Sequence, residues 1–342
     1  MTESTMADSL AKQKTPHRLR QVFPDGEIFL VSDDEWLDQA AASYGLRGIP
    51  LADTGRLPRK ANVVLFLRHG LVSAEVRQMF PHAAVLCVPV ASFDPGLEAG
   101  LYTHKLAMLT DYAGARERSS YWADSISRCT GPVIFSSDAA ATNGATPGST
   151  HLVCGLADQV TADAWLERSI RPGQWVSIGT LCEFSVVPPS LDDWRGAFTI
   201  DGTAVASGVL AARDARCTEA GDGRIRAAGR LRRELAARRP VTLRLEGGVL
   251  TSITAGGEDF TEALREVTNP DYGLQALELG IGTNQSVLPL VRWEFNSQLN
   301  EGAGPVHLGF GDGMTGAHMD FVVAECTHRF PAPARPAGTS QA

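Results

Sequence analysis

The sequence predicts a mixed fold in which a three-layer α/β half precedes a mainly antiparallel half. In the first half, short runs rich in valine, isoleucine and leucine alternate with amphipathic segments, which is typical of a parallel sheet covered on both faces. In the second half, longer strands follow one another through glycine turns, which is typical of an antiparallel sheet. A chain of 342 residues is also long for a single core and favours two domains.

The strand-like runs of the first half are apolar over nearly their whole length, so we expect each to be buried on both faces. These runs are EIFLVS (27–32), ANVVLFL (61–67), AAVLCVPV (83–90) and GPVIFSS (131–137). The segments between them have helical periods and are DDEWLDQAAASYGL, LVSAEVRQMF and the stretch from about 96 to 128. This alternation predicts a parallel sheet with the fourth run as its last strand. No GxGxxG motif follows the first run and no GxxxxGK(S/T) motif occurs in the sequence, so a nucleotide site is unsupported.

The runs of the second half are longer and are separated by glycine-containing turns. They are STHLVCGL, QWVSIGTLCEFSVVP, FTIDGTAVASGVL, VTLRLEGGVLTSITAGG and the closing runs between Ala276 and Val323. A basic segment with helical spacing, GRIRAAGRLRRELAARRP (223–240), interrupts them. Its arginines either form a solvated helix face or attract an acidic ligand or peptide, and the sequence leaves both interpretations open.

The change of pattern near residue 150 gives the expected domain organisation. We expect a reduced α/β domain over residues 19–148 and a second domain over residues 149–330. The ends, 1–18 and 331–342, are compositionally loose and are predicted to be disordered.

Composition argues against several classes of function. The sequence contains 44% hydrophobic and 20% charged residues, which is ordinary for a globular protein. Its formal net charge of −8 argues against general binding of nucleic acid. The first residues lack the apolar core of a secretion signal, and no apolar run is long enough to span a membrane. We therefore expect a cytoplasmic protein without nucleic-acid or membrane partners.

Four side chains of metal-ligating type lie in strand-like context near the end of the second half: Glu278, His307, His318 and Asp320. One residue separates His318 from Asp320, so on a strand both project from the same face while Met319 points into the core. Glu278 and His307 each lie between apolar neighbours, and a buried carboxylate needs a cation or a hydrogen-bond network. Imidazoles and carboxylates together suit zinc, manganese or iron, among which the sequence does not choose.

Each of these residues also has an ordinary structural interpretation. A single histidine such as His307 is commonly a hydrogen-bonded core residue. Glu278 can instead pair with Arg292, and Glu183 can end a strand before Pro188. For each residue taken alone, the sequence leaves these alternatives open.

Four motifs follow one another in the second half: CEFSVVPP, ELGIGTN, NEGAGPVHLGFG and AHMD. In this order they resemble the thermophilic-type metallo-aminopeptidase family, which includes aminopeptidase T and aminopeptidase S, over roughly residues 150–325. The resemblance implies an aminopeptidase-like second domain, a homodimer and a two-metal site. The ligands that it implies are Glu183, Glu278, His307, His318 and Asp320. It also implies that Glu183 or Glu301 moves the proton during peptide cleavage.

The sequence departs from the pattern of that family at more than one position, and Cys182 stands where the family has a glycine. Met314 stands where the family has a tyrosine that helps to stabilise the tetrahedral intermediate, and a methionine cannot donate that hydrogen bond. Diverged relatives of the family serve as peptide-binding proteins in ribosomal-peptide natural-product biosynthesis. We therefore expect a protein that binds a precursor peptide at a cleft and hydrolyses it weakly or not at all, with its divalent metal either retained or lost. The alternatives are an active metal-dependent aminopeptidase and a ring-cleaving dioxygenase with one ferrous ion, because the 2,5-dihydroxypyridine dioxygenases share the fold.

Overall fold

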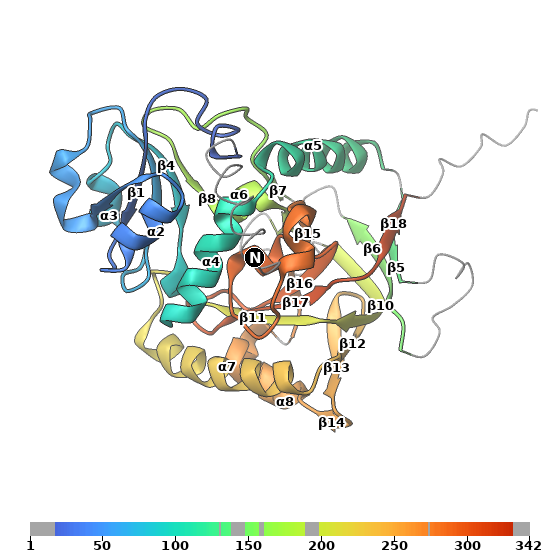
Figure 1. Ribbon diagram of the computed structural model, residues 1–342. Helices are drawn as coiled ribbons and strands as arrows, with labels where there is room; N and C mark the ends of the chain where they lie inside the picture. Colours follow the sequence, from blue (N-terminus) through green and yellow to red (C-terminus); the bar gives the residue numbers. More distant parts are fainter. Residues whose placement is uncertain are drawn as a thin grey trace, which may run out of the picture.

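Three β-sheets and the helices packed on them form the part of the chain that the structure describes (Figure 1). In this computed structural model the described residues are 18–129, 131–137, 148–156, 161–188, 198–272 and 274–330. One sheet is parallel and two are antiparallel, so the mixed architecture predicted from the sequence is confirmed. Of the ends predicted to be disordered, 1–17 and 331–342 lie outside the described residues. No helix in the described ranges is long and apolar enough to cross a membrane.

A five-stranded parallel sheet, in the order β2-β1-β3-β4-β8, forms one end of the molecule (Figure 1). Its strands are β1 (Ile28–Ser32), β2 (Arg47–Pro50), β3 (Asn62–Phe66), β4 (Ala84–Val88) and β8 (Trp175–Ser177). Alternate residues enter two different cores, with Leu30 and Leu86 in one and Phe29 and Val85 in the other. Burial on both faces explains why β1, β3 and β4 are continuously apolar, as the sequence predicted.

The segments between these strands are helical, as expected. They are α2 (Leu37–Ser43), η1 (Leu51–Arg56), α3 (Ala74–Gln78), η2 (Val90–Ser92), α4 (Leu97–Leu109) and α5 (Tyr112–Arg128). The long stretch 96–128 divides into two helices because Asp111 begins a new one, its carboxylate accepting from the Gly114 N–H at 3.3 Å. From α4, the Tyr102 hydroxyl donates to Asn300 Oδ1 at 2.6 Å, which ties this half to the last helix of the other half.

Two strands belong to other sheets than the sequence suggested. The placement of GPVIFSS as the last parallel strand is wrong, because β5 (Val133–Ser136) is antiparallel to both of its neighbours. Its residues are alternately buried and half-buried, which is typical of a strand with one core-facing side. The fifth parallel strand is instead β8, since the run QWVSIGTLCEFSVVP divides into β8, α6 (Ile178–Cys182) and β9 (Glu183–Val187). The domain boundary at 148/149 stays a prediction.

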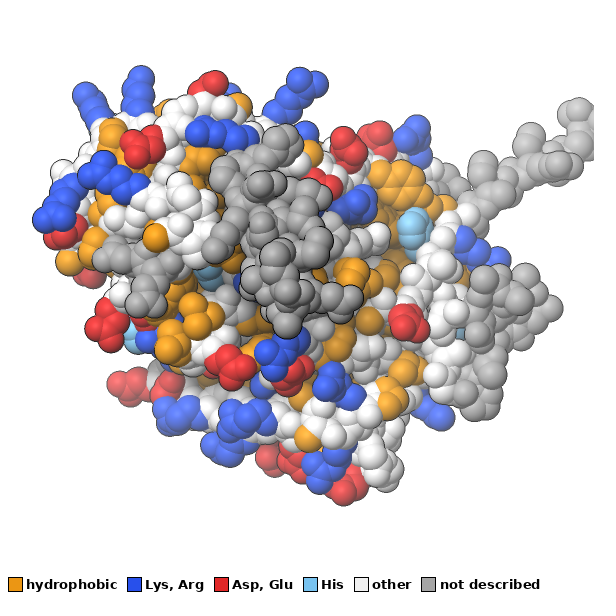
Figure 2. Space-filling view, viewed as in Figure 1, with side chains coloured by type: hydrophobic (Ala, Val, Ile, Leu, Met, Phe, Trp, Pro, Cys, Tyr) orange, Lys and Arg blue, Asp and Glu red, His pale blue; other side chains and the backbone are white. Residues whose placement is uncertain are grey.

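A seven-stranded antiparallel sheet, in the order β14-β13-β12-β10-β6-β5-β18, lies at the other end (Figure 1). Besides β5, its strands are β6 (His151–Leu156), β10 (Phe198–Ala206), β12 (Val241–Glu246), β13 (Val249–Ala255), β14 (Glu258–Asp259) and β18 (Thr327–Arg329). The predicted basic helix is α7 (Glu219–Ala237), which lies against α8 (Thr261–Thr268) and buries Leu231 and Leu235. Figure 2 shows basic side chains gathered over the outer side of α7.

The arginines of α7 have partners that fit a solvated helix face. Arg226 pairs with Asp222 one turn earlier, and Arg238 lies 3.0 Å from the Glu234 carboxylate. Arg232 is buried and donates to the Glu294 carbonyl at 3.2 Å. These contacts support the structural interpretation of the basic helix more than a binding one.

A six-stranded antiparallel sheet lies between the two ends, in the order β11-β17-β16-β15-β9-β7. Besides β9, its strands are β7 (Thr161–Asp163), β11 (Gly208–Ala212), β15 (Ala276–Gly282), β16 (Val306–Phe310) and β17 (His318–Val323). The short helices beside it are η3 (Pro270–Tyr272), η4 (Gln285–Leu290) and α9 (Gln298–Glu301). Every residue of β16 is buried, so polar side chains on this sheet lie inside the protein.

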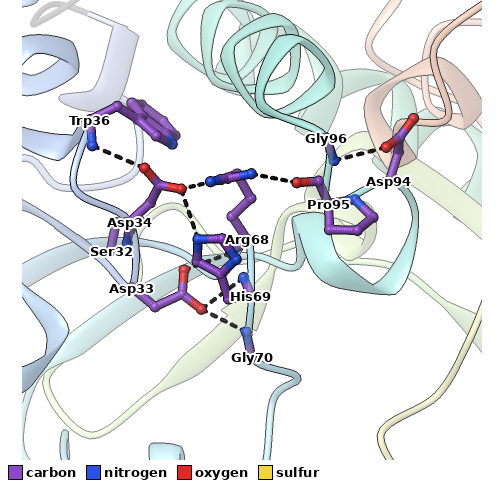
Figure 3. Close-up of polar contacts among 10 residues, drawn as sticks. All are labelled: Ser32, Asp33, Asp34, Trp36, Arg68, His69, Gly70, Asp94, Pro95 and Gly96. Atoms are coloured by element: carbon purple, nitrogen blue, oxygen red, sulfur yellow. Dashed lines mark hydrogen bonds and ion pairs between the residues drawn. The ribbon is translucent and has the colours of Figure 1, made fainter.

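The carboxyl ends of β1 and β3 are joined by a polar network (Figure 3). The Asp33 carboxylate accepts from the backbone N–H groups of Arg68, His69 and Gly70 at 2.7, 2.9 and 2.6 Å. Asp34 is buried and forms ion pairs with Arg68 and with His69. The Arg68 guanidinium also donates to the Pro95 carbonyl at 2.6 Å. This bond fixes the loop between β4 and α4, which forms one wall of the candidate site.

Candidate metal centre

The five residues expected to bind metal come from neighbouring strands of the six-stranded sheet. Glu183 begins β9, Glu278 lies on β15, His307 on β16, and His318 and Asp320 on β17. Their ligand atoms form two groups, Glu183 with Glu278 and His307, and Glu278 with His318 and Asp320. Within each group the atoms lie within 4.8 Å of one another. The structure therefore brings all five side chains together, with Glu278 common to both groups.

The two oxygens of the Glu278 carboxylate face different imidazoles. Glu278 Oε1 lies 3.6 Å from His307 Nε2, and Glu278 Oε2 lies 3.1 Å from His318 Nε2. A further carboxylate approaches the same nitrogen of each imidazole, with Glu183 Oε2 3.9 Å from His307 Nε2 and Asp320 Oδ1 2.9 Å from His318 Nε2. A carboxylate between two histidines is an arrangement that can bridge two ions.

The strand period places His318 and Asp320 on the same side, as the sequence predicted, and Met319 between them is fully buried in the core. The His318 ring is fixed by its second nitrogen, because Nδ1 lies 2.8 Å from the Gly311 carbonyl and donates to it. This bond leaves Nε2 facing the two carboxylates, which is the orientation that metal-binding histidines require.

Two glycines make room for these side chains. Gly280 on β15 pairs with His307 on β16, and a Cβ at this position would lie 1.9 Å from His307 Nε2. A Cβ at Gly309 would lie 2.8 Å from both Glu278 Cβ and His318 Nε2. The glycines of ELGIGTN and HLGFG are therefore needed because the imidazoles lie directly over the backbone of the neighbouring strand.

Glu301, the other expected proton carrier, lies on α9 beside the same cluster. Its side chain is buried, and its Oε1 has no hydrogen-bond partner in the described part of the chain. Both oxygens of Asp320 are likewise buried without a directed hydrogen bond, although His318 lies close to one of them. Unsatisfied buried oxygens of this kind require a proton or a cation.

Burial and neighbouring carboxylates raise the pKa values of two of the acids. The pKa of Glu183 rises to about 8, because it is buried and lies near the charge of Glu278. The pKa of Glu301 lies well above its usual range, because it is buried and faces Asp320. Without a metal ion, both side chains therefore hold a proton more readily than an exposed glutamate does.

The pKa of the shared carboxylate is lowered, whereas the pKa values of the two histidines are raised like those of Glu183 and Glu301. Burial alone would raise the pKa of Glu278, but hydrogen bonds with His307 and His318 hold it well below its usual range. Burial alone would lower the pKa of His307, but the contact with Glu278 raises it to about 9. The pKa of His318 is also well above its usual range, because Asp320 and Glu278 outweigh its burial. In the absence of metal, protons occupy the positions that a cation would take.

The cluster opens into a cavity of about 270 Å³. Besides Glu183, Glu278, Glu301 and His318, its walls include Ser92, Phe93, Arg213, Asp214, Gln298 and Asp312. Sequence reasoning missed this second set of residues, which lie in loops, at the end of η2 or on α9 and which only the tertiary fold brings together. Asp312, in GFGDG, had a local signal as a polar residue next to the expected ligand strand.

Two of the structural interpretations that the sequence left open, a Glu278–Arg292 pair and a strand that ends at Glu183, are not found in this structure. Arg292 lies 2.7 Å from Glu294 and 3.5 Å from Glu98, whereas Glu278 contacts the two histidines. Glu183 begins its strand and does not end it. Met314 lies in the turn after Asp312, where its N–H donates to the Asp312 carboxylate at 2.9 Å.

In a comparison with protein-family models, residues 25–331 match the crocagin biosynthetic protein CgnE/B family. The chain belongs to the CgnE/B family. The expectation of a role in ribosomal-peptide natural-product biosynthesis is thereby confirmed at the level of the family. A search of the curated proteins found no match for this CgnE/B-family chain.

The donor set of this CgnE/B-family protein fits a divalent metal ion. Carboxylates and imidazoles converge in two groups, and buried oxygens of Asp320 and Glu301 lack other partners in the described part of the chain. Nitrogen and oxygen donors without a thiolate suit zinc, manganese or iron, and the geometry does not choose among these ions.

Proposed function

We propose that this member of the CgnE/B family is a metal-binding protein that holds a precursor peptide in a cleft during crocagin-type biosynthesis. The observation that carries the proposal is the shared carboxylate of Glu278, whose oxygens face two imidazoles at the floor of a cavity. Membership of a ribosomal-peptide biosynthesis family supports a peptide as the ligand.

The metal ligands that we propose are the five residues of the two groups: Glu183, Glu278, His307, His318 and Asp320. A divalent ion bound there would polarise a peptide carbonyl and lower the pKa of a bound water. The chain itself supplies two buried acids with raised pKa values, Glu183 and Glu301, and these can hold or release a proton next to the cavity.

The position of the cavity supports an extended ligand. The loop that follows β4 forms one wall, and the end of β11 with its following residues forms another. These walls are joined, since the Arg213 N–H donates to the Ser92 carbonyl at 3.0 Å and Asn296 Nδ2 donates to the Phe93 carbonyl at 2.9 Å. Clefts at the carboxyl ends of parallel strands are the usual ligand sites of α/β sheets.

We further propose that hydrolysis is weak or absent. Met314 takes the position at which the resembling aminopeptidases have a tyrosine, and the loss of such a donor costs about 3–4 kcal/mol of transition-state stabilisation. A specific observation nevertheless favours an active aminopeptidase as the second candidate. The Tyr272 hydroxyl lies 3.0 Å from Asp312, which lines the cavity, so another phenol reaches the cavity wall.

The test uses zinc-loaded or manganese-loaded protein and a panel of synthetic peptides with free or acetylated N-termini. Binding is measured by isothermal titration calorimetry, and new termini are sought by mass spectrometry. We expect binding without cleavage. Release of N-terminal residues from the unblocked peptides alone, abolished in Glu301→Gln, would instead establish the aminopeptidase. Absence of binding to every peptide would refute the peptide-handling function.

A further inference from the structure

A second cavity of about 640 Å³ adjoins the candidate metal centre. The two cavities share four lining residues, Pro89, Ser92, Arg213 and Asp214, so they form one continuous cleft. The far part of this cleft lies at the carboxyl ends of β4 and β8, where Trp175, Ser177 and Thr180 line it. A ligand that reaches the metal centre can therefore extend into this second cavity.

The two parts of the cleft differ in charge. The side chains that line only the part at the metal centre include Glu183, Glu278, Glu301, Asp312 and His318, whereas Arg77 and Arg216 line only the second cavity, and Arg213 and Asp214 line both. The single acidic side chain lining the second cavity, Asp214, is engaged by Arg216 through two bonds of 2.9 and 2.8 Å. The remaining two guanidinium groups give this cavity a net positive charge.

The guanidinium groups of Arg77 and Arg213 are only weakly engaged by carboxylates in the described part of the chain. Arg77 lies over the Trp175 ring, with its guanidinium carbon 4.9 Å from the ring centroid, and has no carboxylate partner within the described ranges. The nearest carboxylate to Arg213 is that of Asp222 at 3.9 Å, and this residue already pairs with Arg226. Arg213 Nε is buried without a hydrogen-bond partner in the described part of the chain. A buried guanidinium donor without a partner points to a missing anionic group.

The edge of the parallel sheet offers a place for an extended chain beside these arginines. Strand β8 is the last strand of its sheet and pairs only with β4 among the described strands. Trp175 and Ser177 of β8 both line the cavity. A peptide in extended conformation can lie along such an edge and make main-chain hydrogen bonds, while the side-chain pockets select its sequence.

We propose that Arg77 and Arg213 form a carboxylate subsite of this cleft, which takes an acidic side chain or the C-terminal carboxylate of a peptide whose other end lies at the metal centre. The inference rests on the proposed function and names the class of peptide. Arginine suits this task because its planar fork binds a carboxylate through two parallel hydrogen bonds. The amino end of the peptide then lies at the metal centre, and its carboxylate meets the complementary charge of the arginines.

The experiment uses full-length, zinc-loaded protein and three tripeptides that differ by one group each. Ala-Ala-Glu amide carries a side-chain carboxylate, Ala-Ala-Gln with a free C-terminus carries a terminal one, and Ala-Ala-Gln amide carries neither. We expect one of the two acidic peptides to bind about 10–100-fold more tightly than the neutral peptide, and the tighter of the two identifies the source of the carboxylate.

Two substitutions and a control complete the design. Arg77→Met and Arg213→Met should each remove most of this preference, whereas Arg56→Met, an exposed arginine paired with Asp53, should preserve it. Zinc affinity and thermal stability, measured on the same samples, report whether each variant is folded. Arg77→Glu should reverse the preference and favour Ala-Ala-Lys amide.

The outcomes separate this inference from the proposed function. Equal affinity for the three peptides, or a preference that survives both arginine substitutions, overturns the carboxylate subsite while peptide binding itself stands. If no peptide binds to zinc-loaded protein, the proposed function fails and the subsite falls with it.

Discussion

Replacing Gly280 with alanine should displace His307 from the centre while leaving the rest of the sheet in place. The new Cβ would lie 1.9 Å from His307 Nε2, 2.1 Å from Cε1 and 2.6 Å from Cδ2, whereas ordinary contacts begin at 3.4 Å. The ring must therefore move by about 1.5 Å, which is far more than the roughly 0.2 Å by which metal–ligand distances vary. The group of Glu183, Glu278 and His307 should lose its imidazole.

The expected effects are a loss of affinity and a moderate loss of stability. Metal affinity at this group should fall by more than about 100-fold, because losing even an outer-shell partner lowers it about 10–100-fold. Overpacking should cost about 1–3 kcal/mol, or about 2–6 °C in Tm.

Zinc titration calorimetry and thermal unfolding of Gly280→Ala measure both effects. Gly223→Ala is the matched control, because a Cβ there meets nothing within 4 Å. Unchanged zinc affinity and Tm in Gly280→Ala would refute the assignment of His307.

Four further predictions concern metal affinity, stability and assembly. The pKa of Glu183 is raised to about 8 and that of His307 to about 9, so zinc must displace protons and its affinity should rise between pH 6 and 9. Calorimetry in two buffers of different ionisation enthalpy should detect the released protons. A zinc affinity that does not depend on pH would contradict this prediction. Because both pKa values are higher in the folded state than in the unfolded state, the stability that these groups contribute is complete below their unfolded-state pKa values and is lost as the pH rises through their folded-state pKa values. Metal-free protein should therefore have a lower Tm at pH 9 than at pH 6. An equal Tm at the two pH values would count against the raised pKa values. Asp34→Asn removes the buried carboxylate that pairs with Arg68, so the free energy of unfolding measured in urea should fall by about 3 kcal/mol. A decrease below about 0.5 kcal/mol would mean that the network of Figure 3 contributes little to stability. The homodimer implied by the aminopeptidase resemblance predicts a mass by light scattering of twice the 36.5 kDa of the chain, and the mass of one chain would exclude it.

The parts of the fold that local patterns determine could be predicted from the sequence. Strands β1, β3 and β4 were predictable because they are buried on both faces and must be apolar throughout. The short strand β8 was not, since three residues carry no period and its place beside β4 depends on tertiary pairing. For β5, an apolar run with one half-buried side looked like a parallel strand because its sequence gives little alternation.

The candidate site could likewise be predicted from the sequence only in part. His318 and Asp320 lie on one face because a strand repeats every two residues, which the sequence displays directly. The joining of Glu183 and Glu301 to them came only from the family resemblance, because β9 is far from β17 in the chain and Glu301 lies on a short helix outside the sheet. Arg77 and Arg213 carried no local signal, since their importance arises from a cleft between two sheets that no single segment encodes.

We infer that Glu278 joins two groups of ligands into a divalent-metal centre, and the metal content of the protein measures this directly. Wild-type protein and Glu278→Gln are incubated with zinc, manganese or ferrous iron, freed of unbound ions and measured by inductively coupled plasma mass spectrometry. We expect one or two ions per chain for the wild type and none for Glu278→Gln, with both proteins folded. Wild-type protein that retains no ion, or Glu278→Gln that retains as many as the wild type, would contradict it.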